Sequence, residues 1–282
     1  MRYEITYRSD YAYSAPVAGN HNRLRMRPFS AGTQRCEHFD VRVDPDAIHH
    51  DHEDLFGNSV VEILVPQPHQ SMRIEVDALV ATTDPLPAPD ANWADLRTDA
   101  YREMAGMYRY SVRPDDSHKD LEELLELVRG DTPASTVSLI TTRLNERFAY
   151  KPGVTTVKST VEDFVRLGAG VCQDFAHLGI ALLRDHDIAA RYVSGYYFTT
   201  PDAAGASAEV ETHAWVEALL PVSGDGDHVW HPIDPTNGIP AGEAHVKIGH
   251  GRWYRDVPPV EGSFTGGASS TVEAKVMMRR LD

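Results

Sequence analysis

The sequence contains few cysteines, since Cys36 and Cys172 are the two thiols among 282 residues. Two cysteines do not make the disulfide framework of a small secreted domain, nor the closely spaced pairs that bind structural zinc. A single disulfide between them is not expected in a reducing cytoplasm. We therefore expect no cysteine-based metal site and no cofactor, and we ask what each free thiol does.

A long hydrophobic run is also missing. No apolar stretch reaches the roughly 18 to 20 residues that are needed to span a bilayer. The first residues, MRYEITYRSDYAYS, are polar and alternating, which is not the pattern of a secretory signal. The sequence therefore predicts a cytoplasmic protein without a membrane partner.

Positive charge is in deficit, with 27 Lys and Arg against 42 Asp and Glu and a net charge of −15. A general binder of nucleic acid or of anionic membranes needs a positive face, so we expect neither partner. The acidity itself indicates solubility. At 282 residues and 41% hydrophobic content, the chain can bury a full core and has room for two domains.

The first 80 residues or so have the patterns of short strands. In YEITYRSDYAYS, Tyr3, Ile5 and Tyr7 alternate with polar residues, which is the period of a half-buried strand. HFDVRVDP, NSVVEILVP and MRIEVDALV continue in the same way, and Gly57-Asn58 predicts a turn between two of them. Such spacing is typical of an antiparallel, sandwich-like domain.

After TTDPLPAPDAN (82–92), which has the Pro and Asp content of a linker, the hydrophobic period becomes helical. LEELLELVRG and DTPASTVSLITTRLNERF predict helices, the second capped by Asp131 or Thr132. STVEDFVRLG predicts another helix, with Ser159 as N-cap and Glu162 completing a capping box. Later segments return to strand patterns, including STVEAKVMMRR at the end. The sequence thus predicts a β-rich domain at 1–85 and an α+β domain at 86–282.

The segment GAGVCQDFAHL (168–178) places a thiol where a glycine-rich turn runs into a helix. Apolar residues recur at helical spacing from Val171 to Leu182, which puts Cys172 in the first turn. The pKa of a thiol, normally about 8.5, falls to roughly 3.5–7.5 at a helix N-terminus or beside a cationic histidine. Free N–H groups of the same turn can hold an oxyanion. Cys172 is therefore either a nucleophile or a small buried hydrophobe.

Two later segments supply a base and a carboxylate. In ETHAWVEALLP, strand alternation puts His213 on the face opposite the apolar core residues, at the start of the strand. In VWHPIDPTNG, Asp234 stands at a strand end, because Pro235 stops the strand. An aspartate there can accept a hydrogen bond from one nitrogen of His213 and leave the other nitrogen facing the thiol of Cys172. This order matches the logic of papain-like Cys-His-Asp catalysis.

Other histidines and neighbours of these residues have weaker patterns. IHHDHEDLFGN (48–58) predicts a solvated polar loop, since adjacent histidines on a strand point to opposite faces and make a poor metal site. His177 lies on the helix of Cys172 but points away from it, so we expect a packing role. His186 and His231 have no better claim. Gln173 is either an oxyanion donor or a supporting amide, and Trp215 either lines the acyl pocket or packs.

These residues together resemble the bacterial transglutaminase-like superfamily, in particular its two-part proteins with a β-rich N-terminal region. The resemblance covers nearly the whole chain. The core motifs, within residues 148–238, are GVCQDFAHL, HAWVE and DPTNG in that order. NRLRMRPF and DLFGNSV near the front, and HVKIGHGRWYRDVPPVEGSFTGG near the end, resemble the flanking parts of such proteins.

The resemblance implies a papain-like transglutaminase core of helices and antiparallel sheet, preceded by a β-sandwich-like N-terminal domain. It implies Cys172 as the nucleophile, His213 as base and acid, and Asp234 as the residue that orients His213. One departure is that Val171 and Gln173 flank the cysteine where animal transglutaminases have an aromatic neighbour. The chain also has no calcium loop of the EF-hand kind. Thiol acyl chemistry therefore follows more firmly than protein cross-linking.

The expected function is amide-bond acyl chemistry on a peptide, protein or other amide substrate, through a thioester on the cysteine. We favour hydrolysis, by a peptidase or amidase, because water needs no dedicated acceptor site. Transglutaminase-type transfer to an amine is the alternative. A non-catalytic binding or scaffold module is a further one, against which the complete set of three residues argues.

Overall fold

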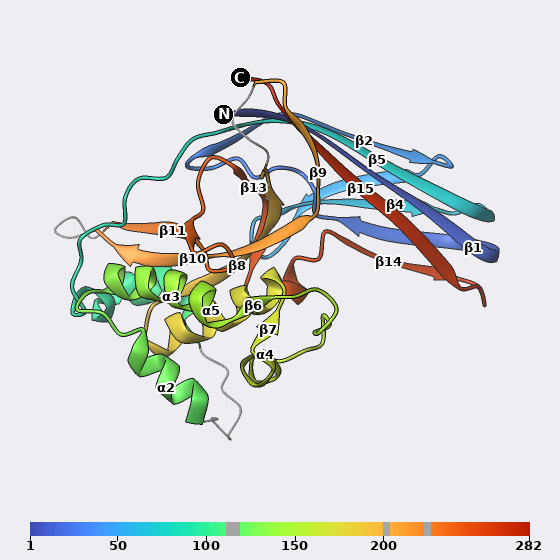
Figure 1. Ribbon diagram of the computed structural model, residues 1–282. Coiled ribbons are helices and arrows are strands. Elements are labelled where there is room, and N and C mark those ends of the chain that lie inside the picture. Colours follow the sequence, from blue (N-terminus) through green and yellow to red (C-terminus); the bar gives the residue numbers. More distant parts are fainter. Residues whose placement is uncertain (111–118, 200–203, 223–226) are drawn as a thin grey trace.

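The computed structural model describes residues 1–110, 119–199, 204–222 and 227–282. Within these ranges the chain forms a larger and a smaller β-sheet, and its longer helices gather on one face of the smaller sheet (Figure 1). The N- and C-termini lie near each other, at the top of the view in Figure 1. No helix in the described ranges has both the length and the apolar character needed to cross a membrane.

The larger sheet contains strands from both ends of the sequence. Its first five strands follow one another in the chain, and three more come from the second half. They are β1 (Arg2–Leu24), β2 (Gln34–Asp44), β3 (Ile48–Glu53), β4 (Ser59–Val65), β5 (His69–Thr82), β9 (Ser207–Val210), β14 (Val260–Thr265) and β15 (Ser270–Arg280).

Strand β1 holds the larger sheet together because it pairs with four others. Its N-terminal half lies antiparallel between β5 and β15, with Tyr3 opposite Val80 and Arg280. Its C-terminal end lies antiparallel to β4 and β14, with Leu24 opposite Val61 and Val260. The alternating tyrosine and isoleucine side chains at the start of β1 are buried, as their period predicted.

The smaller sheet has the order β12-β11-β10-β8-β13, and its pairings are antiparallel. Its central strands are nearly free of solvent exposure. The five strands of this sheet are β8 (Ala190–Tyr197), β10 (Thr212–Pro221), β11 (His228–Asp234), β12 (Ile239–Pro240) and β13 (His245–Gly251). A short parallel pair, β6 (Ala149–Tyr150) with β7 (Ala169–Gly170), lies apart from both sheets.

The helices pack one face of the smaller sheet. Helix α5 runs beneath β8 and β10, and α3 and α4 pack on α5 (Figure 1). Their bounds are α1 (Asp99–Ala105), α2 (Lys119–Leu127), α3 (Pro133–Arg147), α4 (Val161–Leu167) and α5 (Cys172–Asp185); short 3₁₀ turns occupy Asp95–Arg97, Gly106–Arg109 and Tyr254–Asp256.

An aromatic cluster fixes the N-terminal end of α5 against its neighbours. The rings of Phe148 and Phe164 stack with centroids 4.6 Å apart, and Phe175 lies 5.0 Å from Phe164. Such pairs stabilise a fold by about 0.5–1.5 kcal/mol each beyond the burial of their area. Phe148 follows the last residue of α3, Phe164 lies in the middle of α4, and Phe175 lies in the first turn of α5, so the cluster holds that turn in place.

The predicted fold, a strand-rich N-terminal region followed by helices and an antiparallel sheet, is confirmed. The predicted last strand is also present as β15, but it pairs with β1, so the C-terminal residues complete the N-terminal sheet. The boundary between residues 85 and 86 stays a prediction.

Two local predictions were wrong. Helix α4 is capped by Thr160, whose hydroxyl accepts the N–H of Asp163, while Asp163 binds the Thr160 N–H in return. Ser159 instead accepts the N–H of Thr156 in the preceding turn, so the capping box lies one residue later than predicted. The second wrong prediction is the loop expected at 48–58. Its segment IHHDHE forms the exposed strand β3, which pairs in a hairpin with β4 through the predicted turn at Gly57 and Asn58.

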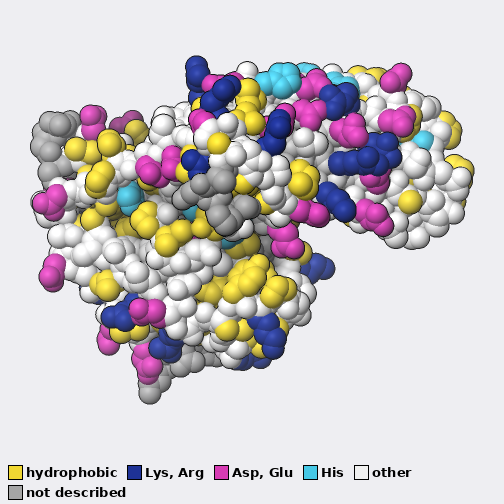
Figure 2. Space-filling view, turned by 45° about the horizontal axis from the view of Figure 1, so that its top comes forward, with side chains coloured by type: hydrophobic (Ala, Val, Ile, Leu, Met, Phe, Trp, Pro, Cys, Tyr) yellow, Lys and Arg dark blue, Asp and Glu magenta, His cyan; other side chains and the backbone are white. Residues whose placement is uncertain are grey.

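Charge on the visible face of the larger sheet is mixed in sign. Figure 2 shows Lys and Arg side chains interspersed with Asp and Glu over its strands, on the right of the view. Ion pairs across neighbouring strands account for this, for example Arg42 with Asp77 and Arg279 with Glu4. Exposed pairs of this kind contribute roughly 0–1 kcal/mol each, so they indicate solubility more than stability.

Gly170 has no room for a side chain. A Cβ there would lie 2.5 Å from the Oδ2 of Asp174 and 2.8 Å from the ring of Phe164. We expect Gly170→Ala to lower the free energy of unfolding by about 1–3 kcal/mol, because overpacking displaces Asp174 and the ring. Urea denaturation measures this change.

The matched control is Gly267→Ala, where an added Cβ meets nothing within 4 Å. That variant should change the free energy of unfolding by less than about 1 kcal/mol in either direction. Equal stability of the two variants would contradict the proposed close packing at Gly170.

Candidate active site

Cys172 is the first residue of α5, as the sequence predicted. The preceding Val171 is extended, and its carbonyl accepts the N–H groups of Asp174 and Phe175. The first N–H groups of a helix have no acceptor within the helix, and the positive end of its dipole lies beside them. The thiol therefore stands next to unpaired donors. Cys172 and Cys36 are both free thiols.

Asp174 anchors this helix start. Its Oδ2 accepts the N–H of Val171 at 2.8 Å and the hydroxyl of Thr155 at 2.6 Å, and the side chain is buried. Val171 has no polar side chain to cap the helix from the N-cap position. The carboxylate of Asp174, the third residue of the helix, instead accepts the N–H of Val171 and so supplies half of a capping box.

The short β6–β7 pair forms one edge of the thiol's surroundings. Ala149 and Lys151 donate N–H groups to the carbonyls of Gly168 and Gly170, which places Tyr150 beside the turn that leads into α5. Tyr150 is close enough to Cys172 for the two to interact electrostatically, and half of its side chain is exposed. It therefore forms an exposed rim next to the thiol.

His213 lies on the face of the smaller sheet that points away from α5. Ala214 and Val216 of the same strand point to the opposite face, where they are buried in the core with the helices, as predicted. The neighbour of His213 across the sheet is Gly195 of β8. A Cβ at Gly195 would lie 2.4 Å from the ring of Trp215, so this glycine leaves room for the indole beside His213.

Asp234 is fully buried and accepts five hydrogen bonds. Oδ1 accepts the backbone N–H groups of Thr236 and Asn237, which is the geometry of an aspartate turn. Oδ2 accepts the amide of Asn237 at 2.6 Å and the Nε2 groups of His213 at 2.8 Å and of His245 at 3.1 Å. Burial alone would raise the pKa of Asp234, but the hydrogen bonds from His213 and His245 hold it well below its usual range.

His213 bridges the carboxylate and the thiol. Since its Nε2 faces Asp234, the remaining Nδ1 is the nitrogen available to interact with Cys172. Burial lowers the pKa of His213, but its interactions with Asp234 and Cys172 outweigh burial and raise the pKa to about 9. At neutral pH both nitrogens of His213 are therefore protonated, and the ring is a positively charged imidazolium. The structure thus brings together the three residues that the sequence singled out.

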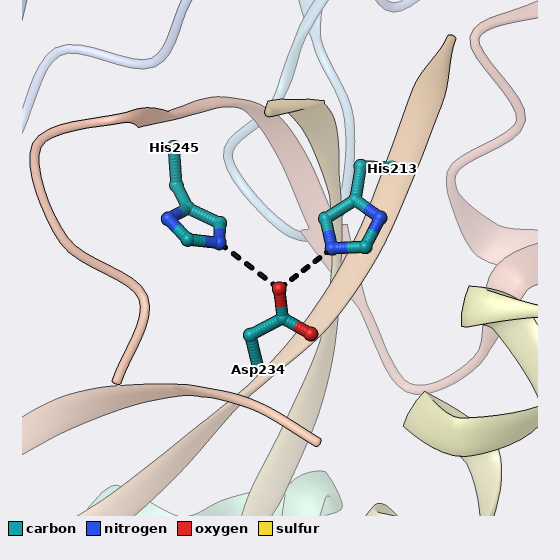
Figure 3. Close-up of side chains that lie close together, drawn as sticks. All are labelled: His213, Asp234 and His245. Carbon is teal, nitrogen blue, oxygen red and sulfur yellow. Dashed lines mark hydrogen bonds and ion pairs between the residues drawn. The ribbon is translucent and has the colours of Figure 1, made fainter. Parts of the chain in front are cut away.

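His245 is a member of this cluster that the sequence reasoning missed. Figure 3 shows its imidazole and that of His213 approaching the same oxygen of Asp234 from two strands. The ring of His245 stacks on Tyr197 with centroids 4.3 Å apart. The segment HVKIGH gives a strand pattern, but nothing in it indicates that β13 pairs with β8 and so carries His245 to Asp234.

The three side chains His213, Asp234 and His245 are close enough together to be considered as metal ligands. The hydrogen bonds of His245 argue otherwise. Its Nδ1 accepts the N–H of Gly242, so its proton resides on Nε2, which donates to Asp234. A protonated nitrogen has no lone pair for a metal, so the cluster fits a hydrogen-bonded network better than a metal centre.

The remaining candidates have structural surroundings. His177 accepts the N–H of Tyr254, and burial lowers its pKa to about 4, so it is a neutral packing residue as predicted. His231 is buried, and burial lowers its pKa as well. Gln173 is buried next to Cys172. Trp215 is buried and packs beside His213, and it also lines a cavity described below.

The comparison with protein families matches both parts of the chain. Residues 3–81 match the bacterial transglutaminase-like N-terminal region, and residues 122–235 match the transglutaminase-like superfamily. An uncharacterized protein of Mycobacterium tuberculosis is 30% identical over 98% of this chain and 91% of its own length. One of Mycobacterium leprae is 28% identical over 99% of both chains.

Among solved structures, a protein from Cytophaga hutchinsonii that is named provisionally as a cysteine protease is similar in fold. It has a TM-score of 0.72 and 25% identity, and the match covers 100% of this chain and 91% of that one. Both the sequence relatives and this structure extend over the N-terminal sheet and the core alike. The chain therefore belongs to the transglutaminase-like superfamily, with a bacterial transglutaminase-like N-terminal region ahead of its core.

Proposed function

We propose that the protein is a cysteine peptidase or amidase that cleaves an amide bond through a thioester on Cys172. The observation that supports this most directly is the sequence of contacts from Cys172 through His213 to the buried Asp234. Membership of the superfamily supports cysteine-based acyl chemistry in general. The assignment of roles to the three residues, and of hydrolysis as the reaction, is our proposal.

In the first step the thiolate of Cys172 attacks the carbonyl carbon of the substrate amide. An imidazolium at His213 and the N-terminus of α5 both favour the thiolate. The N–H groups of Asp174 and Phe175 are bound to Val171, which leaves those of Cys172 and Gln173 for the oxyanion that forms. Preorganised donors of this kind contribute much of the rate of acyl transfer.

In the second step the tetrahedral intermediate collapses and the C–N bond breaks. His213 gives its Nδ1 proton to the departing amine and becomes neutral, and a thioester on Cys172 remains. The hydrogen bond between Nε2 and Asp234 holds the imidazole in one orientation during this transfer. The role of Asp234 is therefore to orient the ring and to stabilise its charged form.

In the third step neutral His213 takes a proton from water, whose oxygen attacks the thioester. The carboxylic acid leaves, and the thiolate and imidazolium return. A primary amine in place of water would make the enzyme a transferase, and we favour water because it requires no acceptor site. The substrate is a peptide or another amide, and the proposed location of the protein is the cytoplasm.

Substitution of Cys172, His213 or Asp234 should lower turnover strongly, whereas substitution of Cys36 should not. On a library of peptidyl coumarin amides, Cys172→Ala should abolish release of the fluorophore. His213→Ala and Asp234→Asn should lower kcat/KM by about 10²–10⁴-fold, since the thiol loses its base or the base loses its orientation. Release of coumarin, with the protein's fold checked by circular dichroism, measures this.

The control is Cys36→Ser, which removes the other thiol, on β2, and should retain full turnover. Addition of cadaverine to the reaction, followed by mass spectrometry of the acyl product, distinguishes hydrolysis from transfer to an amine. Turnover that survives in Cys172→Ala would refute the proposed nucleophile.

Alkylation of the thiols tests the pairing of Cys172 with His213 without any substrate. At pH 6.5 iodoacetamide should modify Cys172 at least about tenfold more slowly in His213→Ala, because the imidazolium that favours the thiolate is gone. The pKa of His213 is raised to about 9, so the wild-type imidazolium is present below that pH and is lost as the pH rises through it. The difference between the proteins should therefore shrink above pH 9.

Cys36 is the internal reference in the same samples, measured by mass spectrometry of the separate peptides. Burial raises the pKa of Cys36, and its surroundings do not include His213. Its alkylation rate should be the same in both proteins at each pH. Equal rates for Cys172 in both proteins at pH 6.5 would instead favour the non-catalytic module.

A further inference from the structure

A cavity lies over the same face of the smaller sheet as His213 and Asp234, and it extends along the strands from their neighbours Trp215 and His245. Its volume is about 530 Å³, within the range of small-molecule sites. Phe29 and residues 31–34 of the N-terminal region, together with Pro85 and Leu86 of the linker, form its other walls. The cavity therefore lies between the two parts of the chain.

Three charged side chains from three strands form one end of this cavity. The Oε2 of Glu217, on β10, accepts a hydrogen bond from the Nε of Arg191 at 2.5 Å and another from the Nζ of Lys247 at 2.7 Å. Lys247 also reaches Oε1 at 2.9 Å. Between 11% and 13% of each of these side chains is exposed, so the cluster is almost removed from water.

The charges in this cluster do not cancel. Burial lowers the pKa of Lys247 to about 8, so at neutral pH Lys247 and Arg191 still contribute two positive charges, and Glu217 contributes one negative charge. Among the described residues that line the cavity, Glu217 is the acidic one. Burial lowers the pKa values of two lining histidines, His231 and His245, so they add no charge at neutral pH. The third lining histidine, His228, has no negative charge to offer. One positive charge is left over in a nearly dry site.

The guanidinium of Arg191 keeps donors free for a ligand. Its Nε binds Glu217, and its Cζ lies 4.0 Å above the ring of Trp230, which orients the plane. Within the described part of the chain, its Nη groups bind no acceptor. An arginine fork with one edge unused is suited to a carboxylate, which it binds through parallel N–H···O bonds.

The rest of the lining is largely apolar. Trp215, Trp230, Phe29 and Leu86 supply aromatic and aliphatic surface around the charged end. A purely structural ion pair within the smaller sheet would need Glu217 and one cation. A second buried cation without an anion raises the free energy of the folded protein unless a ligand neutralises it.

We propose that this cavity is a binding site for an organic carboxylate with an apolar body, held by Arg191 beside Glu217 and Lys247. The carboxylate binds the free Nη groups of Arg191, and the aromatic walls cover the apolar part. The site is separate from Cys172, so its existence does not rest on the proposed amide hydrolysis.

The experiment compares N-acetylphenylalanine with its uncharged amide, N-acetylphenylalaninamide, by calorimetry and by fluorescence of the tryptophans in the cavity. The protein is the full chain with Cys172→Ser, so that no chemistry at the thiol contributes. We expect the carboxylate to bind about tenfold more tightly than the amide or better, because charge-assisted hydrogen bonds form with the carboxylate alone. Equal binding of the pair, or no binding, would overturn the proposal.

Arg191→Gln should bring the affinities of the two compounds to within about twofold, and Arg191→Lys should keep a preference for the carboxylate. The matched control is Arg42→Gln, which removes an exposed arginine from β2, outside the cavity. A preference that persists unchanged in Arg191→Gln, with the fold intact by circular dichroism, would overturn the assignment to Arg191. Should that variant not fold, the comparison of the two compounds on the parent protein still decides the matter.

Discussion

The buried carboxylate of Asp234 is the constraint on which the site depends. A charge with no solvent exposure is tolerable when its oxygens are saturated with hydrogen bonds, and Asp234 has five. The donors come from its own turn, from β10 and from β13. Satisfying this one group therefore fixes the ends of three strands relative to one another, and it sets which nitrogen of His213 faces Cys172.

The two faces of the smaller sheet have different tasks. One face is apolar and packs on α5, whose first residue is Cys172. The other face has the polar and aromatic side chains, from Asp234 and His213 to the buried Glu217. Strand alternation produces this division, since β10 presents small apolar residues to the helices and its polar residues to the N-terminal region. The thiol and the imidazole meet where the helix begins and the strand begins.

The N-terminal region is tied to the core by the chain itself and by contacts across the cavity. Strands β14 and β15 return from the core to pair with β1. The amide of Gln34 binds the carbonyl of Lys247, and the N–H of Lys247 binds Gln34 in return. The region that precedes the core thus helps to build the walls around the polar face of the smaller sheet.

The sequence by itself determined the main elements, since hydrophobic period and turn residues are local properties. These are the strands of the first 80 residues apart from β3, the helix that starts at Cys172, and the candidacy of His213 and Asp234. It misplaced the cap of α4 by one residue, because Ser159 and Thr160 are adjacent and both are preferred N-cap residues. Strand pairing decided the rest. Whether His245 meets Asp234, whether β15 joins β1, and whether Arg191 and Lys247 share Glu217 depend on which strands lie side by side, and that results from packing between residues far apart in the chain.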